Sequence, residues 1–263
     1  MRLKRFYYFW SLVVPGFGVL TFTMLSVHSA PFARHFPAQP QTVSVVNRSR
    51  PAEVALEIIQ DRHGVVITYE DAPYSYEADV DDDTSPEWRR SHPNGFRALV
   101  PKRGSLEVTY YTSRPIISDE IRSAIQKVLD ANAEKNYPGR FRLRQEGEMF
   151  HVEPTQVRDR VGRLVNVRSI LDASISFPQQ ELTGLKALEV ITTAVSRARG
   201  INFVGGTVPQ NRLYRTSLSR GANHETARDI LIDVIKATNS RLSWWILYGP
   251  DLKEYVLNLR EVR

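Results

Sequence analysis

The sequence contains no cysteine. This absence excludes disulfide bonds, thiolate metal sites, a cysteine nucleophile and a cysteine for lipid attachment. It fits an oxidising compartment but also many cytosolic proteins, so it does not assign a compartment. The chain also lacks a run of basic residues interleaved with aromatics, although Lys and Arg outnumber Asp and Glu by 35 to 29. Because its arginines are dispersed, we do not expect a nucleic-acid groove.

The common catalytic motifs are incomplete. "HETAR" (224–228) has Arg228 where a zinc-protease motif needs its second histidine. "SLSRG" (217–221) lacks the glycine that precedes the serine of a nucleophile elbow. Gly205-Gly206 alone does not make a phosphate-binding loop. These gaps favour a non-enzymatic protein without a cofactor, while an enzyme built on an unrecognised constellation stays open.

The N-terminus has the order of an export signal. Three basic residues among the first five precede an uncharged run of 22 residues, Phe6–Val27, and small residues follow it. The run is also long enough to span a bilayer as an uncleaved anchor. Residues 1–30 therefore predict either a signal peptide or a membrane anchor, and both place the rest of the chain outside the cytoplasm. We expect a periplasmic protein, or one anchored in the inner membrane by residues 6–27, with a linker over 31–42.

Apolar residues recur at spacings of three and four in four segments of the body. Each segment predicts an amphipathic helix with polar residues on its other face. The predicted helices cover 52–62, a segment beginning at Ser118, about 183–199, and a segment after Asn223.

Strand patterns surround these helices in the same order in both halves. The first and third helices each precede a glycine-led strand, at 64–69 and 200–206, and the second and fourth each precede a hairpin, at 139–154 and 241–262. Further strand-like stretches precede the helices, at 42–47, 105–112, 173–178 and 212–220. The repeat predicts an α+β fold of two tandem units, 43–153 and 165–263, joined by 154–164. We expect each unit to hold a small sheet with two helices on one face.

The second unit resembles the short periplasmic domain at the start of secretins and TonB-dependent transducers, here called STN-like. The resemblance lies in an "AL" helix, a glycine-led strand, an "A..iL" helix core and a closing "Y.L.L" strand. These parts are Ala187-Leu188, Gly200 to Val204, Ala227 with Leu231, and Tyr255 with Leu257 and Leu259. The first unit matches more loosely, with a long insertion. The resemblance implies a non-enzymatic, extracytoplasmic protein-contact domain.

The stretch "TYEDAPYSYEADVDDD" (68–83) gathers tyrosines and carboxylates where a strand ends. Its candidate binding residues are Tyr69, Glu70, Asp71, Tyr74 and Tyr76. Glu70 and Asp71 have the chemistry of a paired acid and base, but adjacent strand residues point opposite ways. Tyr74 and Tyr76 share a face, which suits stacking on a sugar or a peptide and equally suits covering the end of a sheet.

Three aspartates in this stretch have the spacing of a calcium loop. They are Asp79, Asp81 and Asp83, at relative positions one, three and five. Thr84 takes the place of the turn glycine, and Arg90 takes that of the bidentate glutamate. The stretch is therefore either a calcium site or a solvated acidic loop.

Trp244 and Trp245 are adjacent on a predicted strand and so point to opposite faces. We expect one in the core and the other either exposed as a contact surface or covering an edge. The leading hypothesis is a non-catalytic cell-envelope binding or scaffolding protein that contacts a protein partner through a sheet edge or an aromatic patch. The alternative is a secreted hydrolase or carbohydrate-binding protein that uses residues 69–83.

Overall fold

The four helices predicted from apolar spacing are present in the computed structural model, which describes residues 36–263. They are α1 (Pro51–His63), α3 (Ser118–Glu134), α4 (Gly184–Arg199) and α6 (Ala227–Ala237). Gly64 and Gly200 end α1 and α4 in the left-handed region, at φ of 60° and 64°, where glycine has no Cβ penalty. Thr226 caps α6, since its hydroxyl accepts from the backbone N–H of Asp229 at 3.2 Å. The predicted signal or anchor lies outside the described residues.

Short helices and strands complete the described chain. The helices are α2 (Pro86–Ser91) and α5 (Gln210–Arg215), with single 3₁₀ turns at η1 (Glu77–Asp79) and η2 (Ile170–Asp172). The strands are β1 (Phe36–Ser49), β2 (Val66–Glu70), β3 (Val80–Asp82), β4 (Leu99–Pro101), β5 (Arg103–Arg114), β6 (Arg140–Glu146), β7 (Met149–Arg158), β8 (Leu164–Asn166), β9 (Ser174–Thr183), β10 (Asn202–Gly205), β11 (Ser217–Thr226), β12 (Leu242–Gly249) and β13 (Glu254–Glu261). None of the helices within 36–263 is long and apolar enough to cross a membrane.

Three local expectations differ from the structure. Residues 36–42, expected in the linker, belong to β1, because they pair with β5 from Phe36 onward. The first residues of the strand-like stretch 212–220 lie in α5. The expected joint at 154–164 is partly strand, because β7 continues to Arg158 and then pairs with β8.

The two halves repeat one topology. In the first half β2 pairs in parallel with β7, and β7 pairs antiparallel with β6. In the second half β10 pairs in parallel with β13, and β13 pairs antiparallel with β12. The halves do not keep separate sheets, because β12 pairs in parallel with β2, with Trp245 opposite Tyr69. One sheet therefore runs in the order β10-β13-β12-β2-β7-β6, with β8 added on β7.

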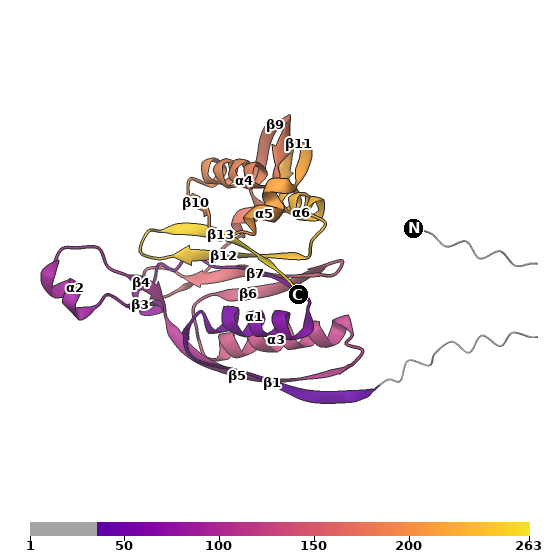
Figure 1. Ribbon diagram of the computed structural model, residues 1–263. Coiled ribbons are helices and arrows are strands. Elements are labelled where there is room, and N and C mark those ends of the chain that lie inside the picture. Colours follow the sequence, from indigo (N-terminus) through magenta and orange to yellow (C-terminus); the bar gives the residue numbers. More distant parts are fainter. Residues whose placement is uncertain (1–35) are drawn as a thin grey trace, which may run out of the picture. The chain divides into compact units, whose positions relative to one another are not determined.

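The strand that precedes the first helix of each half does not join this sheet. Instead β1 pairs with β5, and β9 pairs with β11, as two antiparallel ribbons. Each ribbon lies on the outer side of its two helices, so the helices are enclosed between ribbon and sheet (Figure 1). Each half has its two helices on one face of a sheet, as predicted. The expectation of a separate small sheet in each half, which includes the strand before its first helix, is wrong, because β12 pairs with β2 and those strands form the ribbons.

The halves place their helices on opposite faces of the shared sheet. The helices α1 and α3 cover one face, and α4 and α6 cover the other (Figure 1). Two separate hydrophobic clusters result, one with Ile67 and Trp245 under α1 and α3, and one with Trp244 and Ile246 under α4 and α6. The described chain is therefore α+β, and β12, in the middle of the sheet, is buried on both sides.

Candidate functional site

Glu70 and Asp71, the predicted acid and base, lie where β2 ends. Their exposed fractions are 1% and 2%, so neither carboxylate reaches solvent. As adjacent strand residues they point to opposite faces, and each meets a different arginine. The sequence correctly predicts that they diverge, but burial makes them part of the interior.

Asp71 connects the two halves of the chain on one face. Its carboxylate accepts from Arg50 Nε at 2.5 Å, from the Tyr69 hydroxyl at 2.8 Å, and from the backbone N–H of Tyr248 at 3.0 Å. The Tyr74 hydroxyl also donates to it. Arg50 Nη2 donates to the Tyr248 carbonyl at 2.5 Å, which closes the bridge to β12. Burial and the Asp71 charge raise the pKa of both Tyr69 and Tyr74, so both stay protonated donors.

Glu70 connects the halves on the other face. Arg228, at the start of α6, donates to Glu70 at 2.5 Å and lies 3.3 Å from Glu153 on β7. The Ser169 hydroxyl also donates to Glu70. Burial raises the pKa of Glu70 despite the Arg228 charge. Because Arg228 is only 4% exposed, this is a buried ion pair, whose value to the fold depends on every group being partnered.

His151 lies close to Glu153 and Arg228 and belongs to the same buried polar cluster. It is fully buried, its Nδ1 shares a hydrogen bond of 2.8 Å with the Thr68 hydroxyl, and its ring stacks on Trp244 at 5.1 Å between centroids. Burial, followed by the charges of Arg144 and Arg228, lowers the pKa of His151 to about 4. The imidazole is therefore neutral at neutral pH.

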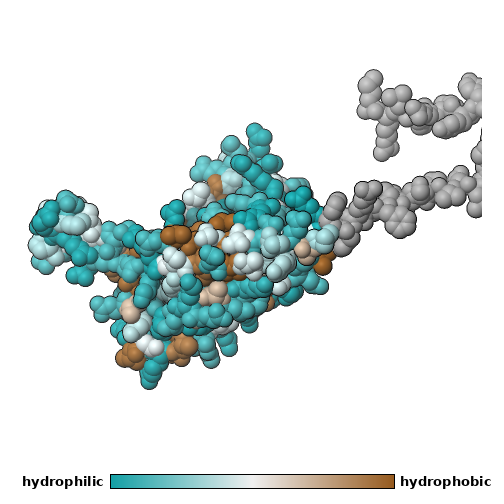
Figure 2. Space-filling view, turned by 90° about the horizontal axis from the view of Figure 1, so that it is seen from below, coloured by the Kyte–Doolittle hydropathy of each residue, from teal (hydrophilic) through white to brown (hydrophobic). Residues whose placement is uncertain are grey.

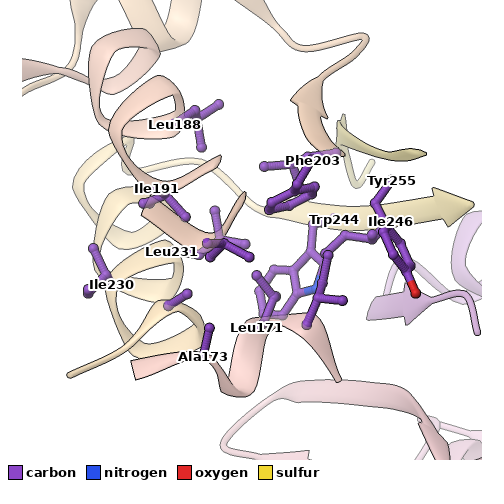
Figure 3. Packing of buried hydrophobic residues seen from close by; sticks show 14 of the residues in the cluster. Leu171, Ala173, Leu188, Ile191, Phe203, Ile230, Leu231, Trp244, Ile246 and Tyr255 are labelled. Carbon is purple, nitrogen blue, oxygen red and sulfur yellow. The ribbon is translucent and has the colours of Figure 1, made fainter. Parts of the chain in front are cut away.

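Trp244 and Trp245 are both fully buried, so the expected exposed tryptophan is not found. Trp244 points with Ile246 toward Leu171 and Leu231, under α4 and α6 (Figure 3). Trp245 packs in the other cluster, 5.7 Å from the Tyr69 ring, and Arg260 lies over it at 5.2 Å. The reason is the position of β12, which has helices on both faces and a strand on either side. An aromatic patch at this pair is therefore excluded.

The three aspartates of the calcium hypothesis do not converge. Asp79 is fully buried and paired with Arg158 at 2.5 Å, whereas Asp83 is half exposed and pairs with Arg103 at 2.8 Å. Asp81 accepts from the backbone N–H of Arg103 at 2.7 Å. Within the described part of the chain no group of three His, Asp or Glu can hold a metal ion. The aspartates instead fasten a lobe made by β3, β4 and α2, whose surface is mainly hydrophilic (Figure 2).

Tyr76 is the one partly exposed tyrosine of the predicted set. It lines a pocket of about 520 Å³ together with Tyr74 and Tyr248, between the lobe and the β12–β13 turn. Charges of both signs line this pocket, from Arg97, Arg160 and Lys253 and from Glu77 and Asp82. Asp82 pairs with Arg89 and Arg97, whereas Arg160 and Lys253 form no ion pair within residues 36–263. The pocket lies at the carboxyl ends of β2 and β12, a place where parallel strands commonly hold ligands.

The open edge of β6 is a feature that motif reasoning missed. The two-residue turn 147–148 makes Glu146 and Met149 a hydrogen-bonded pair, and alternation then turns the backbone groups of Phe141, Leu143 and Gln145 away from β7. Pro154 opposite Phe141 agrees with this phase, because proline has no N–H to exchange. No partner for these backbone groups exists among the described residues.

The other end of the sheet, β10, is closed by its own half. The Ser196 hydroxyl bonds both the N–H and the carbonyl of Phe203, at 3.1 and 3.2 Å. Thr207 turns back onto β13, where its N–H meets the Asn258 side chain at 2.9 Å and its carbonyl accepts from Leu259 at 2.9 Å. Of the two sheet ends, β6 is therefore the available one.

Comparison with known proteins finds no family model that matches this chain. It likewise finds no curated protein and no solved structure that matches.

Proposed function

We propose that this chain is a non-catalytic binding or scaffolding protein of the cell envelope that contacts a protein partner by strand addition at β6. The observation that carries the proposal is the row of backbone groups at Phe141, Leu143 and Gln145, which point away from the sheet without a partner in the described chain. Main-chain hydrogen bonds to such an edge are a common source of affinity in peptide recognition.

The remaining chemistry of the chain supports a contact function. Glu70 and Asp71, the residues best suited to acid–base work, are buried and bound to arginines that join the halves. The proposed envelope location rests on the sequence pattern of residues 1–30, and the STN-like resemblance of the second half belongs to the same proposal. Both are independent of the β6 edge, and the location is tested separately, by fractionation of cells that express the full chain.

A matched pair of substitutions tests the edge. Gln145→Pro removes an outward N–H, which proline tolerates on an edge strand, and Gln145→Thr removes the same side chain but keeps the N–H. We expect an envelope partner captured by the wild-type protein to be retained by Gln145→Thr and lost by Gln145→Pro, with both variants folded by circular dichroism. Retention of the partner by a folded Gln145→Pro protein would show that the edge is not the contact.

The pocket beside Tyr76 supports a second candidate, carbohydrate binding. Three tyrosines surround a space large enough for one or two sugar rings, and its lining also holds cations and the carboxylates of Glu77 and Asp82. Tyr76→Ala would weaken the binding of an oligosaccharide measured by calorimetry, whereas Tyr76→Phe would keep the ring and most of the affinity. The hydrolytic form of this alternative has no support in the geometry, because Glu70 and Asp71 are 1% and 2% exposed.

A further inference from the structure

We infer that the strand added to β6 alternates carboxylate with apolar side chains and places one bulky apolar residue in a pocket beside α3. This inference rests on the proposed function, because it describes the partner of the same edge. It comes from three features of β6: the charge on one face, the apolar surface on the other, and the pocket at one end.

The face of β6 that points away from α3 is basic. Arg140, Arg142 and Arg144 alternate on it, and Arg142 and Arg144 have side chains 59% and 37% exposed. Both share the buried carboxylate of Glu153, which also neighbours Arg228. Arg144 has a second partner in Glu146, 2.8 Å away at the turn end of the same face. Arg140 donates only to neutral oxygens, those of Asn136, Tyr137 and Gly139. Carboxylates on an added strand would lie directly across from these arginines, where opposite charges are favourable.

The opposite face of β6 is apolar. Phe141 and Leu143 point toward α3 and are only partly buried, because β7 lies on one side of them and no strand within residues 36–263 lies on the other. Side chains of an added strand that lie across from these residues would cover the remaining apolar surface. The two faces together therefore select a partner whose residues alternate between acidic and apolar.

A pocket of about 510 Å³ lies at the Gln145 end of β6, on the α3 side. Ile117 and Ile121 of the α3 start, Ile116 and Phe150 give it apolar walls. Ile116 and Ile117 are 38% and 46% exposed, which is unusual for isoleucine next to a core. Gln145 also lines this pocket, so a chain that follows β6 reaches it without a break. A bulky apolar side chain there would act as an anchor.

A second copy of this chain does not have the required chemistry. Pairing β6 with β6 of another copy would bring arginines opposite arginines, and like charges directly opposite are destabilising. The β10 edge of another copy is closed by Ser196 and by the return of Thr207 onto β13. Pairing of β6 with β6 or β10 of a second copy is therefore unfavourable, and the occupant is a different protein that supplies an acidic, alternating strand. The ribbon strands β1, β5, β9 and β11 of a second copy also have a side without a described strand, and self-association of the wild-type chain is the measurement that covers them.

Three synthetic peptides test this chemistry on the full-length protein. They share one frame of alternating valines that ends in phenylalanine, and the intervening positions are all Glu, all Gln or all Lys. We expect the Glu peptide to bind at least tenfold more tightly than the Gln peptide at 50 mM salt, and the Lys peptide not to bind. At 500 mM salt the preference for Glu should fall severalfold, because exposed charge pairs are screened.

Protein variants place the peptide on β6. Arg142→Gln should weaken the Glu peptide severalfold and leave the Gln peptide unchanged, whereas Arg163→Gln, at an exposed arginine on the β7–β8 connection, should change neither. Equal binding of the Glu and Gln peptides, lost in Gln145→Pro, would overturn the acidic partner but keep strand addition. Failure of all three peptides, together with a natural partner that survives Gln145→Pro, would overturn both. Self-association of the wild-type chain that Arg142→Gln strengthens would identify a second copy as the occupant and contradict the inference.

Discussion

In each half the first helix ends at a glycine, Gly64 after α1 and Gly200 after α4. The fifth residue after this glycine is Tyr69 in the first half and Gly205 in the second. Tyr69 packs on Trp245 of β12, whereas Gly205 pairs with Leu257 of β13 on one side and has no described strand on its other side. Two residues earlier the halves agree: Gln60 accepts from the backbone N–H of Ile67, and Ser196 does the same for Phe203, at the same sequence separation. The halves therefore share a scaffold and differ in what lies beside the strand that follows the first helix, because β12 pairs with β2 and no described strand takes that place beside β10.

The outer strand of each hairpin shows the same contrast. Val152 on β7 pairs with Tyr69, and Leu257 on β13 pairs with Gly205, so Val152 and Leu257 occupy equivalent positions. The next residues, Glu153 and Asn258, pair with Arg142 and Trp245, so Trp245 on β12 corresponds to Arg142 on β6. The strand with tryptophan is inserted in the middle of the sheet, and the strand with arginine remains at its end. An apolar residue at this position suits burial between two helix layers, and a charged one suits an edge strand that is protected from unspecific pairing. The residue type at this one position thus distinguishes β12, through which the two halves pair, from β6, which ends the sheet.

Removing Trp245 from β12, where the two halves pair, is expected to have the largest effect on stability. Trp245→Ala should lower the free energy of unfolding by about 5 kcal/mol, the upper part of the range for a buried aromatic, because both Tyr69 and Arg260 lose their packing partner. Arg142→Ala, at the equivalent position, should cost less than about 1 kcal/mol. Urea unfolding measures both, and similar losses in the two variants would contradict the contrast.

The equivalent arginines of the second helices give a slightly smaller expected difference. Arg122 and Arg228 each follow the first buried residue of α3 and α6, but Arg122 is exposed and Arg228 is buried against Glu70. Arg228→Ala should cost about 4 kcal/mol, because it leaves a carboxylate buried without its cation. Arg122→Ala should cost under about 0.5 kcal/mol. An Arg228→Ala protein as stable as wild type would indicate that the pairing of the two halves does not depend on the Arg228–Glu70 ion pair.

The pH dependence of stability is expected to hide two opposite contributions. Burial and the neighbouring Glu57 raise the pKa of Glu53 to about 7, while Arg50 and Arg260 lower it and Asp71 raises it further. Between about pH 4.5 and 7 the folded state keeps a proton that the unfolded state has released. The free energy of unfolding therefore falls as the pH rises through this window, by on the order of 3 kcal/mol.

His151 acts in the opposite direction. With its pKa lowered to about 4, the folded state lacks a proton that the unfolded state holds between about pH 4 and 6.5. This contribution makes the free energy of unfolding rise with pH by a similar amount. Relative to wild type, Glu53→Gln should therefore show stability that rises more steeply between pH 5 and 6.5, and His151→Leu stability that falls. Parallel curves for all three proteins would refute this pairing.

The lobe of the first half is expected to matter least. It contains α2, which buries no residue, and the second half has only α5 in its place. Replacing 84–97 by a short Gly-Ser turn should change the free energy of unfolding by less than about 1 kcal/mol. The lobe deletion can be checked by thermal denaturation, and a loss of several kcal/mol would mean that the lobe supports the core of its half.

Local patterns predicted much of this fold. The spacing of apolar residues located the four main helices, and alternation located both hairpins, because helix and hairpin contacts lie close in sequence. The shared sheet was not predictable in this way, since β2 is short and pairs with a strand far along the chain. The partners of the acidic stretch were not predictable for the same reason, because they also lie far away in the sequence. Arg50 lies 21 residues from Asp71, and Arg228 lies 158 residues from Glu70.

The candidate site was predictable only in part. Alternating arginines and apolar residues in β6 identified a strand, and inward or flanking charge is also a signature of a protected edge. What sequence patterns do not contain is which of two similar hairpins ends the sheet. That depends on the pairing of Trp245 with Tyr69, which decides that β12 is interior and β6 is not.

Amide hydrogen exchange in the full-length protein compares the two hairpins most directly. The N–H groups of Phe141, Leu143 and Gln145 should exchange rapidly, while those at the equivalent positions of β12, Trp244, Ile246 and Tyr248, should exchange only on global unfolding. Addition of a bound partner or of the Glu peptide should slow the first set alone. Strong protection of the β6 amides in the free protein would contradict the account, because the edge on which the proposed function depends would already be occupied.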